Sequence, residues 1–199
     1  MSTTQPIRNK NALKNLKNYY QDTKTNLRNY TIIVMGLNTA LRINDILHLT
    51  YDMVYQNNKV REHIVVKEHK TGKENRILIN KETRNVLAKY RKELIKTKMY
   101  MEGNPYLFPS PKKAGAPLSR YQAYRMITAA AEALDIGENI SCHSLRKTFG
   151  YHAWKQGTDQ IVLMAIFNHS SFAITRRYLC IEQDDKDAVF RNIYGEPAA

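Results

Sequence analysis

The sequence predicts a mainly α-helical fold with one small antiparallel β-sheet, which places the chain in the α+β class. Apolar side chains recur every three or four positions in several long stretches of the 199 residues, and this period is typical of amphipathic helices. β-Branched residues are concentrated in two short runs, 60–67 and 76–79, with a glycine-containing turn between them, which predicts a β-hairpin. The stretch 103–117 contains four prolines and two glycines and is predicted to be a loop.

The first half of the chain divides at residue 24. Residues 1–24 are polar and basic and are predicted to form an N-terminal arm, whose leucines and tyrosines could line one stripe of a helix. Whether the charges of this arm are only solvated or contact a partner stays open. Residues 26–37 are apolar enough for a buried helix. Asn44 is a good N-cap for the next helix, with Asp45 in its first turn, so Arg42 is expected in the junction before it.

The second half is predicted to be helical outside the proline-rich loop. The helical patterns cover residues 81–100, 119–134, 143–156 and 159–167, with Gly157 between the last two. A segment that contains Tyr178 follows, and residues 184–194 are expected to form a final short helix.

The charge balance points to a polyanionic partner. Lysine plus arginine minus aspartate plus glutamate gives 31 − 18 = +13, and the sequence pI is about 9.7. Basic side chains gain affinity by releasing counterions from phosphates. The chain shows no apolar run of the ~20 residues that a membrane span requires and no signal-peptide pattern. With Cys142 and Cys180 as its only cysteines, it is expected to be a soluble protein of a reducing, intracellular compartment.

Two local patterns could carry chemistry, although each is weak alone. His143 and Arg146 are three residues apart in a predicted helix and therefore project from the same face. Tyr178 follows His169 by nine residues and lies among basic side chains. A surface histidine beside an arginine is commonplace, and a tyrosine among basic residues is usually amphipathic packing.

The ordered set Arg42, Lys70, His143-x-x-Arg146, His169 and Tyr178 resembles the tyrosine recombinase family, the lambda-integrase-like site-specific recombinases. The flanking residues match as well. Asp45 stands at the acidic position of the family's first-arginine box, and the predicted hairpin carries Lys70-Thr71-Gly72-Lys73 where the family keeps its lysine. The resemblance covers roughly residues 25–195, so residues 25–199 are expected to be a catalytic domain that ends in the short C-terminal helix.

Two residues depart from the family pattern, and two lysines compete for one role. Ala40 replaces a common glycine before the first arginine, and Asn168 replaces the glycine that commonly precedes the third-box histidine. Asparagine tolerates left-handed backbone geometry, so this box is expected to keep its shape. Lys67 and Lys73 compete with Lys70, which is favoured because it directly precedes the Thr-Gly turn.

The resemblance implies a transesterification at a DNA phosphodiester. Arg42 and Arg146 would bind the nonbridging oxygens, where negative charge grows in the transition state. Tyr178 would attack and form a 3′-phosphotyrosyl link, and Lys70 would give a proton to the leaving 5′-oxygen. His143 would accept or relay the tyrosine proton, His169 would hydrogen-bond the phosphate, and Asp45 would orient the cluster of arginines and histidines.

The resemblance also implies the partners. The expected partner is double-stranded DNA at a specific site, bound by a homotetramer, with accessory DNA-bending proteins and a cytoplasmic, nucleoid-associated location. No metal or nucleotide cofactor is expected, and the spacing of Cys142, His143, His152 and His169 matches no usual zinc pattern. The candidate DNA contacts outside the reaction centre are Lys10, Lys14, Lys17, Arg176 and Arg177.

Several alternatives stay open. The last helix either packs on its own domain or docks on a neighbouring protomer. The chain could also be a type IB topoisomerase-like relaxing enzyme or a non-catalytic DNA-binding protein that retains the fold. About 25 residues before the resemblance are too few for the helical core-binding domain of typical recombinases. In size the chain is similar to the fimbrial phase-variation invertases, and an integrase of a small mobile element is equally compatible.

Overall fold

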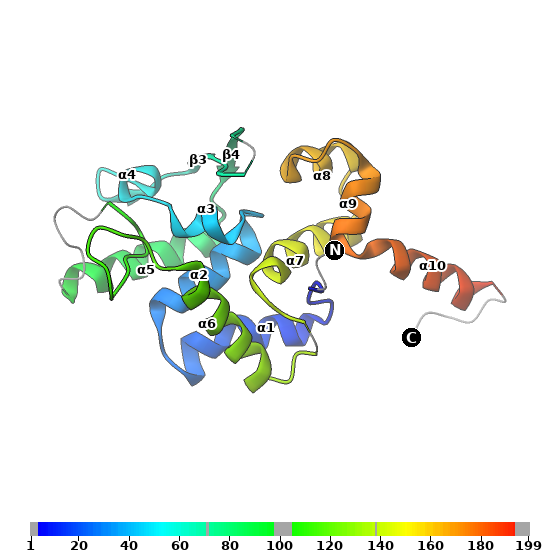
Figure 1. Cartoon of the computed structure of the whole chain (residues 1–199), viewed down its shortest axis with the longest axis horizontal. Coiled ribbons are helices and arrows are strands. Elements are labelled where there is room, and N and C mark those ends of the chain that lie inside the picture. The colour runs from blue at the N-terminus through cyan, green and yellow to red at the C-terminus, as the bar shows by residue number, and fades with distance from the viewer. Residues whose placement is uncertain (1–3, 71, 98–104, 138, 194–199) are drawn as a thin grey trace.

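A computed structural model describes residues 4–70, 72–97, 105–137 and 139–193 (Figure 1). The described part is mostly helical, with two small antiparallel sheets of two strands each, which confirms the predicted class. In chain order the elements are α1 (Lys10–Asn18), the π-helical turn η1 (Tyr19–Thr23), α2 (Leu27–Asn38), α3 (Ile43–Leu47), α4 (Tyr51–Val54), β1 (Tyr55–Gln56), β2 (Lys59–Val60), β3 (His63–Lys67), β4 (Glu74–Leu78), α5 (Lys81–Lys96), α6 (Arg120–Ala133), α7 (Cys142–Lys155), α8 (Gln160–Phe167), α9 (Phe172–Leu179) and α10 (Ile181–Asn192). Among these residues, no helix is both long and apolar enough to cross a membrane.

The main core surrounds α2. Most side chains of this helix are buried, and it packs against α5 and α7. The Asn26 side chain caps the helix by accepting from the backbone N–H of Asn29, at 3.0 Å. Gly36 allows α7 to approach closely, because a Cβ at this position would lie 2.6 Å from Cδ1 of Leu145. The predicted buried helix 26–37 is therefore confirmed, and it joins the two halves of the chain.

The hairpin of β3 and β4 carries the predicted lysine turn. Ile64 pairs with Ile77, and both face the core, whereas Val65 is exposed. The first strand begins at His63 and not at residue 60, because residues 59–60 belong to a separate two-residue pairing with β1. Asn57 and Asn58 both have positive φ, which is the geometry of a two-residue hairpin turn. Asparagine adopts this conformation more easily than most residues, and the sequence analysis missed that signal.

The chain turns sharply between α2 and α3. The backbone of Ala40 is left-handed, with φ of 54°. Arg42 is extended, and α3 begins directly after it.

 The N-cap of α3 is therefore Arg42, and the prediction that Asn44 caps this helix is wrong. The helix starts as soon as the chain leaves the extended conformation at Arg42, which puts Asn44 and Asp45 in the first turn. Arg42 still lies in the junction before the helix, as predicted.

The described part of the N-terminal segment is packed into the main core. Ile7 and Leu16 are buried, and the Tyr20 hydroxyl donates to the carbonyl of Met126 at 2.8 Å. α1 lies along the bottom of the molecule in Figure 1, on the other side of α2 and α7 from the β3–β4 hairpin. The division of the chain at residue 24 stays a prediction, but residues 4–24 share the core of the residues that follow.

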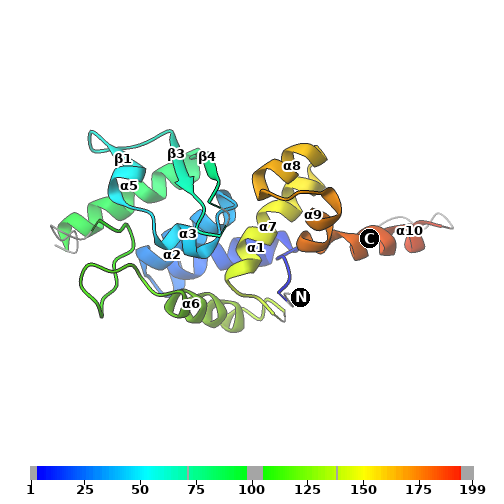
Figure 2. The same ribbon diagram turned by 45° about the horizontal axis from the view of Figure 1, so that its top comes forward.

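A smaller apolar cluster lies at the other end of the molecule, among α7, α8 and α9. We call it the tyrosine cluster, and its buried members are Ala40, Tyr151, Leu163, Phe167, Leu179 and Ile181. Gly150 of α7 allows this packing, because a Cβ there would lie 2.6 Å from Cζ of Phe167. Figures 1 and 2 both show α8 and α9 grouped at this end, with α10 projecting away from the body.

The remaining helices begin and end close to their predicted positions. Asn80 caps α5, and Ser119 forms a capping box with Gln122 at the start of α6. α10 begins at Ile181, three residues before the predicted start, because Cys180 adopts a left-handed conformation that ends α9 and starts a new helix at once. α5 ends at Lys96, four residues before the predicted end at residue 100, and the predicted end of α10 at residue 194 lies outside the described residues.

Candidate active site

The six residues of the ordered set come from five parts of the fold. Arg42 lies before α3, Lys70 lies in the turn between β3 and β4, and His143 and Arg146 lie one turn apart on α7. His169 follows α8 directly, and Tyr178 is in the last turn of α9. The site thus joins the main core to the tyrosine cluster.

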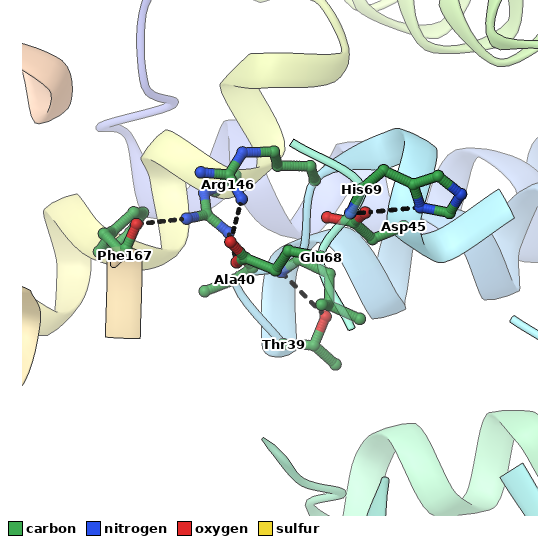
Figure 3. A network of polar contacts seen from close by, with 9 residues as sticks. Thr39, Ala40, Asp45, Glu68, His69, Arg146 and Phe167 are labelled. Atoms are coloured by element: carbon green, nitrogen blue, oxygen red, sulfur yellow. Dashed lines mark hydrogen bonds and ion pairs between the residues drawn. The ribbon is translucent and has the colours of Figure 1, made fainter. Parts of the chain in front are cut away.

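Arg146 is the central side chain of the site. It is 2% exposed, donates to the carbonyl oxygen of Ala40, and donates to the carbonyl of Phe167 at 3.1 Å (Figure 3). Its guanidinium carbon also lies 4.7 Å from the centroid of the Phe167 ring. Because Ala40 belongs to the first box and Phe167 precedes the third, Arg146 holds the two boxes together.

A buried glutamate that the sequence analysis missed lies between the two arginines. The Glu68 carboxylate has no exposed area, and its Oε2 lies 2.6 Å from Nη1 of Arg42. Its Oε1 lies 3.9 Å from Nη1 of Arg146. The alternation of the strand could have revealed it, because positions 64, 66 and 68 share the inward face. A carboxylate on that face has to be buried and paired.

Asp45 contacts the hairpin. Its Oδ1 accepts from the backbone N–H of His69 at 3.0 Å and lies 3.2 Å from Nδ1 of the same residue (Figure 3). Its charge also raises the pKa of Arg146, although burial of that guanidinium has the larger, opposite effect. Asp45 therefore fixes the residue next to Lys70 by hydrogen bonds and acts on Arg146 only through its charge.

The Tyr178 phenol faces the arginine pair. Burial raises the pKa of Tyr178, and the charges of Arg146 and Arg42 oppose that rise. The His169 ring meets the Tyr178 ring edge to face, at 5.3 Å between centroids. The phenol is thus protonated at neutral pH in the free protein, beside two cations that stabilise its anion.

Both histidines of the site favour the neutral form. Burial, followed by the charges of Arg146 and Arg42, lowers the pKa of His169 to about 4. Burial also lowers the pKa of His143, with Arg120, Lys147, Arg146 and Arg42 acting in the same direction. A neutral imidazole has a free acceptor nitrogen. His143 can therefore accept a proton at neutral pH.

Lys70 lies on an exposed turn that faces the same site. The charge of Lys70 contributes to the lowered pKa of His169, which places the lysine within electrostatic reach of that ring. The turn is closed by two backbone hydrogen bonds of Glu68, one donated to Lys73 and one accepted from Gly72. Lys67 and Lys73 are exposed as well, so the choice among the three lysines stays a prediction.

The left-handed position before His169 agrees with the sequence analysis. Asn168 has a φ of 54° and ends α8, so asparagine supplies the conformation for which the family commonly uses glycine. Ala40 adopts the same region, at φ of 54°, where an ordinary side chain is disfavoured. Its carbonyl oxygen accepts a hydrogen bond from Arg146, so this backbone conformation positions an acceptor for the arginine.

The other predicted DNA contacts are spread over the surface. Lys10 and Lys14 are exposed on α1, whereas Lys17 forms an ion pair with Glu82 at 2.8 Å. Arg177 is exposed and Arg176 half-buried on α9. The sequence analysis did not single out the start of α6, where Arg120, Tyr121 and Tyr124 line a cavity together with His143. In the described part of the chain, no group of three or more histidines, cysteines and carboxylates is placed to hold a metal ion.

The fold and this cluster define a tyrosine recombinase, an enzyme that cleaves and rejoins DNA at specific sites. The chain belongs to the phage integrase family, whose model matches residues 8–184.

Two curated relatives illustrate the range of similarity. The chain is 39% identical over 191 residues to the probable integrase/recombinase YoeC of Bacillus subtilis, a match that covers 96% of this chain and 97% of that protein. It is 27% identical over 157 residues to tyrosine recombinase XerD of Pseudomonas aeruginosa, covering 79% of this chain and 51% of XerD. The chain thus spans nearly all of YoeC and about half of XerD.

Solved structures share the fold. The crystal structure of XerA recombinase matches with a TM-score of 0.74 and 20% identity, over 98% of this chain and 67% of that one. XerH site-specific recombinase, bound to a palindromic difH substrate in a post-cleavage complex, matches with a TM-score of 0.73 and 19% identity. That alignment covers 96% of this chain and 53% of XerH.

Proposed function

We propose that Tyr178 is the nucleophile that cleaves DNA and holds it as a 3′-phosphotyrosyl link. The observation that carries this proposal is the packing of the Tyr178 ring against the rings of Phe167 and His169, at 5.6 and 5.3 Å between centroids, while Arg146 donates to the carbonyl of Phe167. The charges of Arg146 and Arg42 both act to lower the pKa of Tyr178. Two guanidiniums can bind the nonbridging oxygens of one phosphodiester, and their positive charge stabilises the charge that develops during attack. The phenol then lies next to the phosphorus that it attacks.

The proposed reaction moves two protons. The Tyr178 oxygen forms a bond to phosphorus as the bond from phosphorus to the 5′-oxygen breaks. The phenol proton goes to His143, whose lowered pKa keeps it neutral and able to accept, and Lys70 gives a proton to the departing 5′-oxygen. His169 hydrogen-bonds the phosphate. Because one phosphoester replaces another, the reaction as proposed needs no nucleotide or metal to supply energy.

A suicide substrate nicked next to the scissile phosphate tests the nucleophile. Wild-type protein should accumulate as a slowly migrating covalent adduct, and Tyr178→Phe should bind the same DNA without forming one. Tyr30→Phe is the matched control, because Tyr30 lies on α2 and packs against the main core. Equal trapping by Tyr178→Phe would exclude this tyrosine.

The general acid is tested by replacing the leaving 5′-oxygen with sulfur. A thiolate leaves without a proton, so Lys70→Ala should cleave this substrate at close to the wild-type rate while failing on ordinary DNA. Lys67→Ala and Lys73→Ala are the matched controls on the same hairpin. If the sulfur substrate selectively restored cleavage by Lys67→Ala or Lys73→Ala, that lysine would be the general acid.

Double-stranded DNA at a specific site is the proposed substrate. The net charge of +13 supports a phosphate partner, and the XerH structure shows a relative of the same fold on DNA. Arg120, Tyr121 and Tyr124 line a cavity with His143 at the start of α6, and we propose that their side chains contact the DNA beside the reaction centre. A plasmid that lacks the specific site separates this function from topoisomerase-like relaxation. We expect no relaxation of that plasmid, and efficient relaxation would favour the alternative.

We further propose that the protein assembles as a homotetramer on DNA through α10. Val189, Phe190 and Ile193 are exposed at the end of this projecting helix, Phe190 by 73%, and such apolar side chains can dock on a neighbouring protomer. Protein truncated after Gln183 should remain folded, as judged by its circular dichroism spectrum, but should form no synaptic complex in a gel. Recombination at the full rate, or unfolding, would contradict the docking. Accessory DNA-bending proteins and a nucleoid-associated, cytoplasmic location stay predictions that the family resemblance implies.

A further inference from the structure

Glu68 is a buried carboxylate in the middle of a site built to bind an anion. Its Oε2 is 2.6 Å from Arg42 and its Oε1 is 3.9 Å from Arg146, and the carboxylate has no exposed area. A negative charge beside a phosphate-binding site repels the phosphate, so we expect this carboxylate to have another role. The proposed reaction gives Glu68 no bond to make or break.

We propose that Glu68 is a positioning residue that sets the two arginines relative to each other and to the turn that carries Lys70. This inference rests on the proposed function of Arg42, Arg146 and Lys70. It assigns to Glu68 the orienting role that the sequence analysis gave to Asp45 for the arginines, while Asp45 secures the hairpin beside it.

The first step of the argument concerns charge. Arg146 is 2% exposed and the Arg42 side chain 18%, so water screens their mutual repulsion poorly before DNA arrives. A carboxylate between them offsets that repulsion and keeps both guanidiniums in place. Each guanidinium has five N–H donors, so pairing with Glu68 leaves donors for a phosphate. The arginines are therefore organised in the free protein.

The second step concerns the backbone of the same residue. The Glu68 N–H donates to the carbonyl of Lys73 at 2.9 Å, and its carbonyl accepts from the N–H of Gly72 at 2.8 Å. Glu68 thus closes the Lys70 turn with its backbone and holds the arginines with its side chain. A shift of the side chain is transmitted to the turn, because both belong to one residue. Misplacing a catalytic group by about 1 Å can cost ~10²-fold in rate.

These two steps predict opposite effects on binding and on cleavage. Glu68→Gln removes a negative charge beside the phosphate site, so DNA binding should stay equal or become tighter. The arginines and the turn lose their charged anchor, so the rate of adduct formation at saturating DNA should fall by about 10- to 100-fold. A residue with only a structural role would lower thermal stability, and its folded fraction would react at the wild-type rate.

The experiment measures single-turnover trapping and DNA affinity for Glu68→Gln, with Glu74→Gln on the same hairpin as the matched control. Glu74 is exposed on β4, so its variant should match wild type in both measurements. Coupling to the turn is read from the substrate with a sulfur leaving group. Glu68→Gln should recover part of its cleavage rate on this substrate, because the proton from Lys70 is no longer needed. The loss of rate that remains measures the misplacement of Arg42 and Arg146.

The outcomes separate this inference from the proposed function. A Glu68→Gln rate within twofold of wild type, with Arg146→Ala inactive, would overturn the positioning role and leave the proposed function intact. Weaker DNA binding by a folded Glu68→Gln would also overturn it. Adduct formation by Tyr178→Phe would instead refute the proposed function. If Glu68→Gln does not fold, Glu68→Asp takes its place: it keeps the charge on a shorter side chain, and a wild-type rate would overturn the inference.

Discussion

The two apolar clusters of the molecule position different residues of the proposed active site. The main core, built around α2, fixes Arg42 and the β3–β4 hairpin, and it extends to α5 and α6. The tyrosine cluster is much smaller and fixes Tyr178 on α9 and His169 just after α8, two helices of eight residues each. Arg42 and the hairpin that carries Lys70 therefore stand on the more extensively packed part, and His169 and the proposed nucleophile Tyr178 on the less packed part.

Arg146 joins these two parts. Its guanidinium lies 3.9 Å from the Glu68 carboxylate of the hairpin, and it donates to the carbonyls of Ala40 and Phe167, which both belong to the tyrosine cluster. Regions with few buried apolar contacts open more readily than the main core of a domain. The comparison teaches that the position of Tyr178 depends on a small number of contacts, so changes near those contacts should affect cleavage before they affect the fold.

The largest expected effect is that of Arg146→Ala. The change removes a proposed oxyanion donor, and losing such a donor costs ~10²–10³ in rate in comparable sites, whereas one phosphate contact among many weakens DNA binding only modestly. It also leaves Glu68 without one of its two arginines, a kind of loss that costs roughly 3–5 kcal/mol for a buried pair. Suicide-substrate trapping, DNA affinity and chemical denaturation measure the three effects. Equal losses in cleavage and binding would mean that Arg146 only anchors DNA.

A pair of glycine variants tests the comparison more finely. Gly36→Ala pushes on Leu145 in the main core, and Gly150→Ala pushes on Phe167 and Leu179 in the tyrosine cluster. Overpacking typically costs ~1–3 kcal/mol, and we expect this loss for both. At a temperature where both variants are folded, only Gly150→Ala should slow adduct formation, because Leu179 is adjacent to Tyr178. If Gly36→Ala slowed adduct formation and Gly150→Ala did not, the position of Tyr178 would depend on the main core and not on the tyrosine cluster.

The smallest expected effect is a pH dependence of stability from His169. Its pKa is about 4 in the folded protein and 6.5 ordinarily, so between these values the unfolded state binds more protons. Stability contributed by the neutral imidazole is therefore present above pH 6.5 and is lost as the pH falls towards 4. Between pH 7 and 5 the loss amounts to at most ~2 kcal/mol. Denaturant unfolding of His169→Gln should show a shallower decline than wild type, and identical declines would contradict the lowered pKa.

Local patterns predicted most of the fold and the set of candidate residues. The hairpin, the buried α2 and the left-handed Asn168 all follow from short-range preferences, such as β-branched runs, apolar period and asparagine backbone geometry. The start of α3 was placed at Asn44 because its side chain favours the cap, but the turn at Ala40 starts the helix after Arg42. That turn depends on tertiary packing, which a local pattern does not report.

Glu68 shows where prediction from the sequence stopped. Strand alternation places Glu68 on the inward face, unlike the exposed Glu74, but its contact with Arg146, which is 78 residues away, follows only from the tertiary structure. The burial of Ile7 and Leu16 was missed for a related reason, because a basic segment with scattered apolar residues becomes part of a core only when α2 and α7 provide the other side.

The most direct test of the account is to locate the covalent link in the trapped adduct. The chain has 13 tyrosines, and trypsin, which cleaves after Arg177 and Lys186, releases Tyr178 at the start of a short peptide. After nuclease trimming, mass spectrometry should find a nucleotide 3′-phosphate attached to Tyr178 in this peptide, with a free 5′-hydroxyl on the other DNA product. Attachment to any other tyrosine, or through a 5′-phosphate, would contradict the account.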